Sequence, residues 1–581
     1  MKSDRVGTLR VALVQMNASV GALAANARGI VERAHGAAKG GADLIVFPEM
    51  ALSGYPPEGL LRNPDFLSDC AKELRALAAS LPPEPVVVLG APIQERKAIF
   101  NAAVVFQGGR LRGVHRKRYL SDSDVFDERD FFEAGVRASV VDIGGLRVGL
   151  LISDEVCSTH APQNAFRGAG VAAVVTTAAL AFRRGALAVR RKVLGALARL
   201  MGVPVLSANL VGGQDESVFD GASLALDARG RLRARADQFV ETILHVEVPL
   251  EGKRPPRISK GWKGATIRVP RLGSVQKSPR AEGYDGVATS AVPRNSIAPE
   301  LSDLEQVYGA LVLGLRDYVG KNGFGKVVLG LSGGVDSALV AAICVDALGA
   351  DRVVGVTMPS SITASETLGD ALRLAKNLGI EIHTVSIRRL HEAYLEELSP
   401  LWPGRPLDLT EENIQARIRA NTLMALSNKF GWLVVTTGNK SEVATGYCTL
   451  YGDSAGGFSL IRDVPKTLVW TLSRWRNRSG EVIPETIIER APSAELRPGQ
   501  KDQDSLPPYD VLDEIIVRYL DRGMRMAAIV ADGFDPEVVK RTIRLIDRSE
   551  FKRRQAAPGI SLTPWVFRSG RRLPITNLYR V

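Results

Sequence analysis

Short apolar runs rich in β-branched residues alternate with helical patterns along most of this 581-residue chain. A repeated strand–helix–strand order is typical of parallel sheets that are covered by helices on their faces, so the alternation predicts an α/β protein. In the first half, strands are predicted at 9–15, 43–49, 86–92, 99–106, 146–153, 172–178 and 203–211, and helices near 24–39, 64–80 and 184–202. In the second half, strands are predicted at 327–331, 353–358, 381–387 and 432–437, and helices at 302–320, 336–348, 363–378 and 411–430.

The two alternating halves are separated by a basic segment. Ten lysines and arginines fall between Lys253 and Arg294, in a segment broken by Pro, Gly and Ser whose only acids from residue 251 onward are Glu251, Glu282 and Asp285. Such a composition is typical of a solvated connector. We therefore predict a first domain over 1–250, a connector over 251–303 and a second domain over 304–581, the latter built on a doubly wound parallel sheet.

Composition excludes several classes of protein. No run approaches eighteen apolar residues, so no membrane span is expected. The first residues lack the apolar stretch of a signal peptide, and the four cysteines are scattered without a CxxC pair, which predicts a cytoplasmic protein without a disulfide framework. The net charge of +12 suits a nucleic acid or an anionic nucleotide. The basic patches lack interleaved aromatic residues, so we expect no nucleic acid partner, and a non-enzymatic nucleic-acid binder is an alternative that rests on charge alone.

A glycine turn at 332–334 is the sharpest local signal. The segment LGLSGGVDSALVAAICVDAL (329–348) passes from a buried strand through Ser-Gly-Gly into an apolar helix. Backbone N–H groups at such a helix start attract phosphate. The turn lacks the lysine of a Walker loop. Asp336 is either a first-turn acid of the helix or a Mg²⁺ ligand beside a bound pyrophosphate, and we favour the second role.

The SGGxDS turn resembles that of the adenine nucleotide α-hydrolases, the ATP pyrophosphatase superfamily, which cut ATP between its α- and β-phosphates. Segments at 412–428, 436–457, 461–470, 490–513 and 550–559 are similar to NAD⁺ synthetase, so the resemblance covers about 304–581. It implies ATP, Mg²⁺ and deamido-NAD⁺ as reactants. The carboxylate of deamido-NAD⁺ would be converted to an acyl adenylate, with release of pyrophosphate, and ammonia would then displace AMP.

The same resemblance implies the residues of this site. Asp336 and Glu442 would hold Mg²⁺. Arg417 and Arg419 stand two apart on a predicted helix and cannot share one face, so at least one of them is expected to be structural. ATP would contact Ser332, Gly333, Gly334, Asp336, Ser337, Lys466, Ser493 and Lys552, and deamido-NAD⁺ would contact Arg417, Arg419, Asn421, Lys440 and Asp453.

Segments of the first half, at 47–61, 115–135 and 209–230, resemble the nitrilase or carbon-nitrogen hydrolase superfamily, and in particular the glutaminase domain of glutamine-dependent NAD⁺ synthetase. The resemblance implies an αββα sandwich and a catalytic set of Glu, Lys and Cys. Glu49 and Lys117 match two of these positions, and Glu128 is placed to orient them. The thiolate would attack the amide, the Glu would act as base and the Lys would stabilise the oxyanion.

The nucleophile position departs from the pattern, because Ser153 stands where the family carries Cys. An alkanol is a much weaker acid than a thiol, and a carboxylate base does not replace the imidazole of serine hydrolases. Cys157 lies four residues later, beyond the turn. Residues 121–123 and 180–182 also depart from the family, which a single engineered exchange would not explain. We therefore expect a degenerate site in a retained fold, and ammonia rather than glutamine as nitrogen source.

Several readings stay open. The chain is predicted to be an NAD⁺ synthase that uses ammonia; the alternatives are a fully active glutamine-hydrolysing synthase, an adenylating amidotransferase for another carboxylate, and a nitrilase-type amidase with a regulatory second half. The resemblance also implies a homo-oligomer, either a dimer or an octamer.

Overall fold

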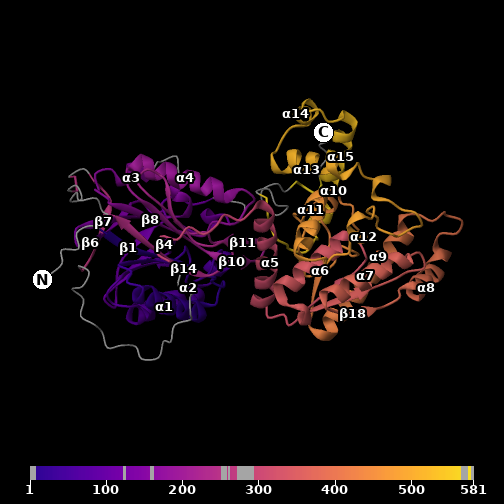
Figure 1. The fold of residues 1–581 in the computed structure, drawn as a ribbon, viewed down its shortest axis with the longest axis horizontal. Coiled ribbons are helices and arrows are strands. Elements are labelled where there is room, and N and C mark those ends of the chain that lie inside the picture. Colours follow the sequence, from indigo (N-terminus) through magenta and orange to yellow (C-terminus); the bar gives the residue numbers. More distant parts are fainter. Residues whose placement is uncertain are drawn as a thin grey trace. The chain divides into compact units, whose positions relative to one another are not determined.

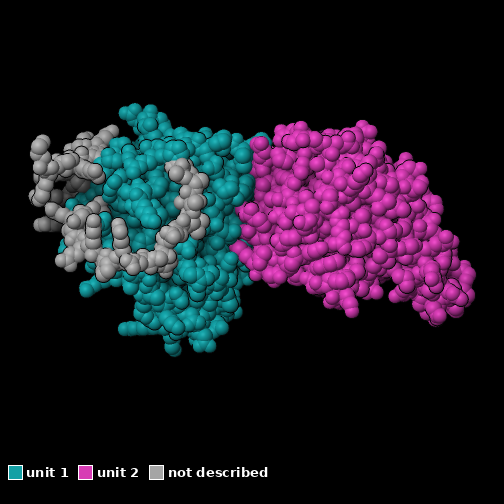
Figure 2. All heavy atoms as spheres, turned by 60° about the horizontal axis from the view of Figure 1, so that its bottom comes forward, with its two compact units in different colours: residues 1–214, 218–302 teal, residues 215–217, 303–581 magenta. Residues whose placement is uncertain are grey.

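The structure, a computed structural model, describes residues 8–121, 126–157, 162–249, 258–259, 262–270, 293–563 and 573–576. The chain separates into two compact units, residues 1–214 with 218–302 and residues 215–217 with 303–581 (Figure 2). Much of the predicted connector lies outside the described residues. Its residues Ala265–Val269 are not a loop, however, because they form a strand, β15, that pairs in parallel with β6.

The described residues of unit 1 form two large sheets and four α-helices, and Figure 1 shows how these elements are arranged. The first sheet has the order β14 (Thr242–Pro249), β1 (Thr8–Gln15), β2 (Leu44–Val46), β3 (Val86–Glu95), β4 (Ala98–Gln107) and β5 (Arg110–Arg116). The second has the order β13 (Leu232–Arg235), β12 (Leu224–Leu226), β9 (Val205–Asn209), β8 (Ala173–Ala178), β7 (Leu146–Ile152), β6 (Ser139–Ile143) and β15 (Ala265–Val269). The other elements are the strands β10 (Val211–Gln214) and β11 (Ser217–Asp220), the α-helices α1 (Leu23–Lys39), α2 (Pro64–Ser80), α3 (Pro162–Phe166) and α4 (Ala186–Met201), and the short helices η1 (Glu58–Arg62), η2 (Glu128–Asp130) and η3 (Ser153–Cys157).

Three buried clusters show how these layers pack. One cluster joins the two sheets and includes Leu13 of the first and Leu150 of the second. Another joins α1 and α2 to the outer face of the first sheet, and a third joins α3 and α4 to the outer face of the second. Because each sheet is therefore apolar on both faces, its strands read as continuous apolar runs rather than alternating ones. The predicted αββα sandwich is confirmed.

Unit 2 is built on a five-stranded sheet whose neighbouring strands are all parallel. Its order is β18 (Glu381–Thr384), β17 (Val353–Thr357), β16 (Val327–Gly330), β19 (Leu433–Thr436) and β20 (Phe458–Ser459). The α-helices are α5 (Asp303–Lys321), α6 (Val335–Leu348), α7 (Ser365–Leu378), α8 (Arg388–Leu398), α9 (Leu409–Phe430), α10 (Lys440–Thr445), α11 (Lys466–Arg476), α12 (Glu485–Glu489), α13 (Tyr509–Ile516), α14 (Met526–Ala531), α15 (Pro536–Arg548) and α16 (Glu550–Arg553). Shorter turns of helix are η4 (Ala350–Arg352), η5 (Ser399–Leu401), η6 (Asn477–Ser479), η7 (Asp502–Asp504) and η8 (Val517–Asp521).

The strand order of unit 2 confirms the predicted doubly wound sheet and locates its ligand edge. From β16 the chain proceeds to β17 and β18 on one side, and then returns to β19 and β20 on the other. In sheets of this kind, ligands bind outside the carboxyl ends of the strands at the point where the order reverses. That point lies between β16 and β19. The loops that follow these two strands are therefore the place to look for a site.

A second apolar cluster in unit 2 gathers the C-terminal helices. Buried side chains of α13, η8, α14 and α15 pack together and against Ala444 of α10. Figure 1 shows α10 beside α13 and α15. The helix that follows β19 thus packs against helices built from residues between Leu506 and Ile546. Across the described part of both units, no helix combines the length and the apolar character that a bilayer crossing needs.

Candidate active sites

The loop after β16 is shaped by its glycines and closed by two hydroxyls. Gly333 has φ +78°, and a Cβ at this position would lie 2.4 Å from the carbonyl oxygen of Thr367 on α7, so the loop requires glycine there. Ser332 Oγ accepts from the N–H of Gly334 at 3.2 Å, and Ser337 Oγ donates to the Gly334 carbonyl at 2.9 Å. The N-terminal end of the fourteen-residue helix α6 therefore points toward the ligand edge of the sheet, where the helix dipole favours a bound anion.

The loop is also held from α7. Arg490 donates to the carbonyl of Gly333 at 3.2 Å and forms an ion pair with the buried Asp370. Burial raises the pKa of Asp370, but hydrogen bonds from Thr486 and Arg373 and the charge of Arg490 outweigh this, and the net shift is downward. Asp370 therefore stays ionised and keeps Arg490 against the loop.

Residues from three elements meet beside this loop. Lys466, the first residue of α11, forms an ion pair with Asp336 of α6, and its Nζ lies 4.0 Å from Glu442 Oε1 of α10. Asn439, which precedes α10, donates from Nδ2 to Asp336 Oδ1 at 2.9 Å. The structure thus brings together Asp336, Glu442 and Lys466, three of the residues that sequence reasoning singled out.

The charges of this cluster are mutually dependent. Burial raises the pKa of the Glu442 carboxyl well above its usual range, and the neighbouring Asp336 raises it further while Lys466 opposes the shift. Burial lowers the pKa of Lys466, but Asp336 and Glu442 outweigh this and raise it. The lysine is therefore a cation that partly neutralises two carboxylates.

The donor set fits a divalent cation carried by a nucleotide. Mg²⁺ in enzymes is typically held by one or two carboxylates together with substrate phosphates and water, which is what Asp336 and Glu442 could supply. Among the residues that the structure describes, no group of three or more His, Cys, Asp or Glu side chains forms a metal cage. The remaining ligands would therefore have to come from the phosphates and water.

The backbone that carries Lys466 and Glu442 is anchored by Asp513 of α13. Its carboxylate accepts from the N–H of Thr467 at 2.9 Å and from the hydroxyl of Ser441, and Ser441 Oγ in turn accepts from the N–H of Lys466 at 3.0 Å. One buried carboxylate therefore joins the beginnings of α10 and α11 to the C-terminal helices.

Two other predicted phosphate contacts lie elsewhere in the described structure. Lys552 of α16 donates to the carbonyl oxygens of Gly446 and Cys448, both at 2.7 Å, so it holds the loop that follows α10. Ser493 is exposed, and its hydroxyl accepts from the N–H of Glu495 at 3.0 Å. Their contact with ATP stays a prediction.

The residues predicted for deamido-NAD⁺ divide into two groups. Arg417 is exposed and donates to the carbonyl of Leu450, whereas Arg419 donates to the carbonyl of Met358, just beyond β17. Asn421 is exposed on α9, and Asp453 is exposed and accepts from the N–H of Thr449 at 2.7 Å. These four residues are accessible or lie near the ligand edge, and their role in binding stays a prediction.

Lys440 differs from that group because it is completely buried. Its Nζ lies 2.8 and 2.9 Å from the two carboxylate oxygens of Asp521, 2.9 Å from Asp463 Oδ1 and 3.1 Å from the hydroxyl of Thr563. Burial lowers the pKa of Lys440, and the two carboxylates outweigh this and raise it. In this arrangement the ammonium group ties α10 to the C-terminal segment of the chain.

Unit 1 carries a second buried cluster between its strands. Lys117, directly after β5, lies 3.0 Å from Glu49 Oε1 and 2.8 Å from Glu128 Oε2, and all three side chains are at most 1% exposed. Asn101 of β4 donates to both carboxylates, at 2.6 Å to Glu49 and 2.7 Å to Glu128. Burial lowers the pKa of Lys117, but the two carboxylates outweigh this and raise it, so the lysine is a fixed cation.

Ser153 completes this cluster at the end of β7. It has φ +38°, a left-handed conformation that L-residues rarely adopt and that presents a side chain at a sharp strand-to-helix turn. Its hydroxyl donates to Glu49 Oε2 and accepts from the N–H of Ala179 at 3.0 Å. The predicted trio of Glu49, Lys117 and Ser153 is therefore assembled. Cys157 is exposed at the end of η3, whereas the trio is buried.

Comparison with known proteins assigns both units. Residues 10–255 match the carbon-nitrogen hydrolase family model, and residues 307–556 match the NAD synthase model. The chain is 42% identical to the glutamine-dependent NAD(+) synthetase of Thermotoga maritima and 41% identical to that of Rhodobacter capsulatus, over 98% of this chain and 99% of each relative. The chain belongs to the glutamine-dependent NAD⁺ synthetase family. It is thus a ligase, and its chain consists of a nitrilase-like unit and an NAD synthetase unit.

A solved structure of this family supports the assignment. The glutamine-dependent NAD⁺ synthetase of Acinetobacter baumannii, determined with ADP, superposes with a TM-score of 0.73 at 36% identity and covers 98% of this chain and 99% of its own. Another, from Cytophaga hutchinsonii, superposes with a TM-score of 0.80 at 21% identity and supports the fold alone.

The sequence did not point to two asparagines of this synthetase, Asn439 and Asn101, whose side chains contact the carboxylates of the two clusters. Asn439 lies within the quoted segment 436–457, and the N-x-x-E pattern of Asn439 and Glu442 is a recognisable helix-start signature. Asn101 is a polar residue within the apolar run 99–106, which is itself a signal because a fully buried amide requires partners. Neither pattern by itself reveals that the Asn101 amide donates to two carboxylates or that the Asn439 amide donates to Asp336.

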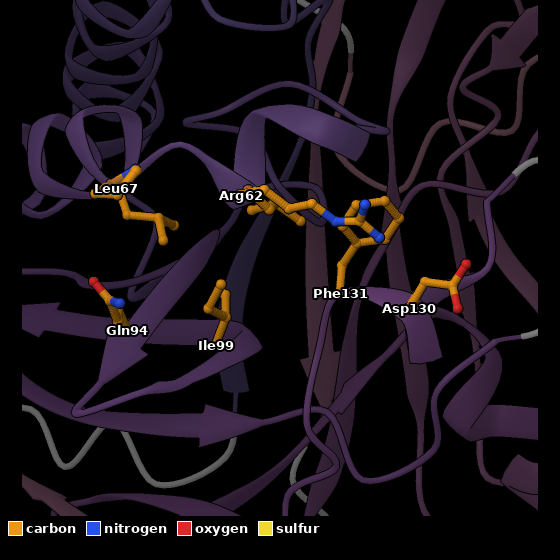
Figure 3. A pocket seen from close by; sticks show the side chains of 8 residues that line it. Arg62, Leu67, Gln94, Ile99, Asp130 and Phe131 are labelled. Atoms are coloured by element: carbon orange, nitrogen blue, oxygen red, sulfur yellow. The ribbon is translucent and has the colours of Figure 1, made fainter.

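A cavity of about 360 Å³ also lies in unit 1 of the synthetase, between η1, α2 and the β3–β4 hairpin (Figure 3). At the edge of this cavity, the Arg62 guanidinium lies over the Phe131 ring, 4.9 Å from the ring centre. Phe131 stacks on Phe126, whose ring packs edge-on against Tyr55 at 5.7 Å. Glu49, Lys117 and Ser153 are not among the residues that line this cavity, so it is a different place from the Ser153 site.

Proposed function

We propose that this chain makes NAD⁺ by ATP-dependent amidation of deamido-NAD⁺, with AMP and pyrophosphate as by-products and free ammonia as its nitrogen source. The family assignment and the cluster of Asp336, Glu442 and Lys466 at the switch point support the synthetase reaction. The observation that carries the choice of ammonia is the hydroxyl of Ser153 at the nucleophile position of unit 1.

The synthetase reaction follows from the poor reactivity of a carboxylate toward ammonia. Transfer of AMP to the carboxylate of deamido-NAD⁺ releases pyrophosphate and forms a mixed anhydride, and ammonia then forms the amide as AMP departs. Negative charge develops on the phosphates during the first step. The backbone N–H groups at the start of α6 and the ammonium of Lys466 are placed to counter it. Mg²⁺ held by Asp336 and Glu442 would supply further charge neutralisation.

Glutamine hydrolysis requires a readily ionised nucleophile, which the cluster in unit 1 does not supply. Glu49 accepts a hydrogen bond from the Ser153 hydroxyl, and the Lys117 ammonium lies 3.0 Å from Glu49, an arrangement that supports the proposed roles of base and oxyanion partner. A buried carboxylate is nevertheless a weak base toward an alkanol, and the thiol that would ionise readily is missing. The relatives are named for glutamine dependence, so glutamine-driven synthesis is the second candidate.

The test supplies the full chain with ATP, Mg²⁺ and deamido-NAD⁺, and with either ammonium chloride or glutamine. NAD⁺, AMP and pyrophosphate report synthesis, and glutamate reports amide cleavage. We expect NAD⁺ from ammonium and a glutamine-driven rate lower by at least about 10³-fold, the scale lost when a nucleophile is removed from a catalytic unit.

Ser153→Ala is the matched control. If Ser153 is not a nucleophile, the variant retains the ammonium-driven rate and leaves glutamate release unchanged. Comparable rates from the two donors, or a glutamate release that disappears in S153A, would show that serine serves the glutaminase reaction. Absence of AMP and NAD⁺ with both donors would overturn the synthetase reaction itself.

A further inference from the structure

Asn439 occupies the junction between the two loops of the synthetase site. It follows β19 and immediately precedes α10, and its side chain is completely buried. Asp336 lies 103 residues earlier in the chain, at the start of α6, and Glu442 lies three residues later. A single asparagine therefore stands between two carboxylates on helices that follow different strands of the sheet.

The hydrogen bonds of Asn439 connect these two carboxylates. Its Nδ2 donates to Asp336 Oδ1 at 2.9 Å, and its main-chain N–H donates to Glu442 Oε2 at 3.2 Å. Its Oδ1 accepts from the main-chain N–H of Glu442 at 3.1 Å, in the first turn of α10. One residue thus orients both carboxylates and also caps the helix that carries one of them.

Two carboxylates in a buried site repel each other unless something holds them. Lys466 pairs with Asp336 and lies 4.0 Å from Glu442, so it reduces the repulsion, but a flexible ammonium gives no fixed direction to either group. The amide of Asn439 is rigid and donates in a fixed direction to Asp336 Oδ1, an oxygen that Lys466 does not contact. Orienting partners of this kind commonly control metal affinity.

We propose that Asn439 is a positioning residue that presets Asp336 and Glu442 for the divalent cation that accompanies ATP; this rests on the proposed synthetase function. An amide suits this role because it donates to one carboxylate while it accepts the helix N–H. Aspartate would place a like charge 2.9 Å from Asp336, and serine would cap the helix but is too short to reach it.

The difference between asparagine and serine provides the experiment. Asn439→Ser keeps a capping hydroxyl for α10, because Asn and Ser are similarly good at this position, and it removes the donor to Asp336. Asn439→Thr serves the same purpose if N439S does not fold. Asn477→Ser is the matched control, since Asn477 also joins two backbone segments of this unit through three hydrogen bonds but lies outside the site.

The first readout is binding of Mn²⁺, followed by its electron paramagnetic resonance signal, to the full chain with an ATP analogue that carries a methylene between the α- and β-phosphates. The second is the Mg²⁺ concentration that half-saturates pyrophosphate release. We expect N439S to weaken Mn²⁺ binding about 10- to 100-fold and to raise the Mg²⁺ requirement in parallel. N477S should leave both unchanged, and the thermal midpoint of N439S should stay close to that of N477S.

The outcomes separate this inference from the proposed function. If the unaltered chain makes NAD⁺ but N439S binds Mn²⁺ within twofold of it, Asn439 is only a helix cap and the inference is overturned. If the unaltered chain makes no NAD⁺ with either nitrogen donor, the proposed function fails, whatever the Mn²⁺ titration gives.

Discussion

Replacement of Lys440 by methionine should leave two buried carboxylates without their shared cation. The lysine side chain and Asp463 are 0% exposed and Asp521 is 11% exposed. Removal of one partner from a buried ion pair costs about 3–5 kcal/mol. Asp463 keeps hydrogen bonds from the N–H groups of Leu562 and Thr563, at 2.6 and 2.8 Å, so the loss falls mainly on Asp521. We therefore expect the lower end of this range, about 3 kcal/mol at pH 7.

The pH dependence of this loss has a definite sign. Burial already raises the pKa of Asp521. Without Lys440 its largest opposing influence is lost and the hydrogen bond from Thr563 is left against burial and the charge of Asp463, so the folded pKa of the variant lies above the unfolded value. The destabilisation is then fully present above the folded pKa and shrinks as the pH falls through it, because the protonated carboxyl no longer needs a cation. The difference between K440M and the unaltered chain should therefore narrow as the pH falls from 8 toward 5.

Tryptophan fluorescence during denaturant unfolding is a suitable assay, since five of the six tryptophans lie after residue 302. Lys429→Met is the control, because Lys429 is exposed at the end of α9, and such surface changes usually stay within about 0.5 kcal/mol. A K440M variant that unfolds within about 1 kcal/mol of the K429M control but shows a raised KM for deamido-NAD⁺ would refute this reasoning. Lys440 would then be a substrate ligand, as the family resemblance implies.

Two further predictions concern the phosphate loop and unit 1. Gly333→Ala should force the loop away from α7, since its Cβ would lie 2.4 Å from the Thr367 carbonyl at a positive φ. We expect a loss of about 1–3 kcal/mol of stability and a raised KM for ATP. The control is Gly369→Ala on α7, where a Cβ meets open space; it should leave the KM for ATP unchanged and raise stability by at most about 1 kcal/mol, because alanine favours a helix interior over glycine. Glu155 is buried and accepts from the N–H of Ile152 at 2.8 Å, with His115 Nε2 3.0 Å away; burial raises the pKa of Glu155, but His115 and the neighbouring hydrogen bonds outweigh this and lower it. Because this folded pKa lies below the unfolded one, the stability that Glu155 contributes is fully present above the unfolded pKa of about 4.3 and disappears as the pH falls through the folded value. The difference in thermal unfolding between Glu155→Gln and the unaltered chain should therefore begin to narrow as the pH falls below about 4.3, and a gap that stays constant with pH would contradict the assignment.

Long elements were predictable because their signals are local. The helix at 64–80 has Asn63 as its cap and Pro64 at its first position, and the structure places α2 over the same residues. The strand predicted at 381–387 is longer than the observed strand, because β18 ends at Thr384 and α8 begins at Arg388. The strand β15 was not predicted, because it lies within the expected connector. A short edge strand in a basic segment has no strong sequence pattern and forms only where β6 offers it hydrogen-bonding partners.

By itself, the sequence determined the α/β architecture, the phosphate loop after β16 and the presence of serine at position 153, because apolar periodicity, turn chemistry and residue identity are all written locally. Tertiary structure alone decided which charged groups meet. Lys440 stands only two residues before Glu442 in the chain, yet its side chain contacts Asp463 and Asp521, while Asn439 contacts Asp336 from 103 residues away. The energy of a charge in a protein depends on burial and on the neighbours that the fold brings within a few ångströms, and neither quantity can be read from its position along the chain.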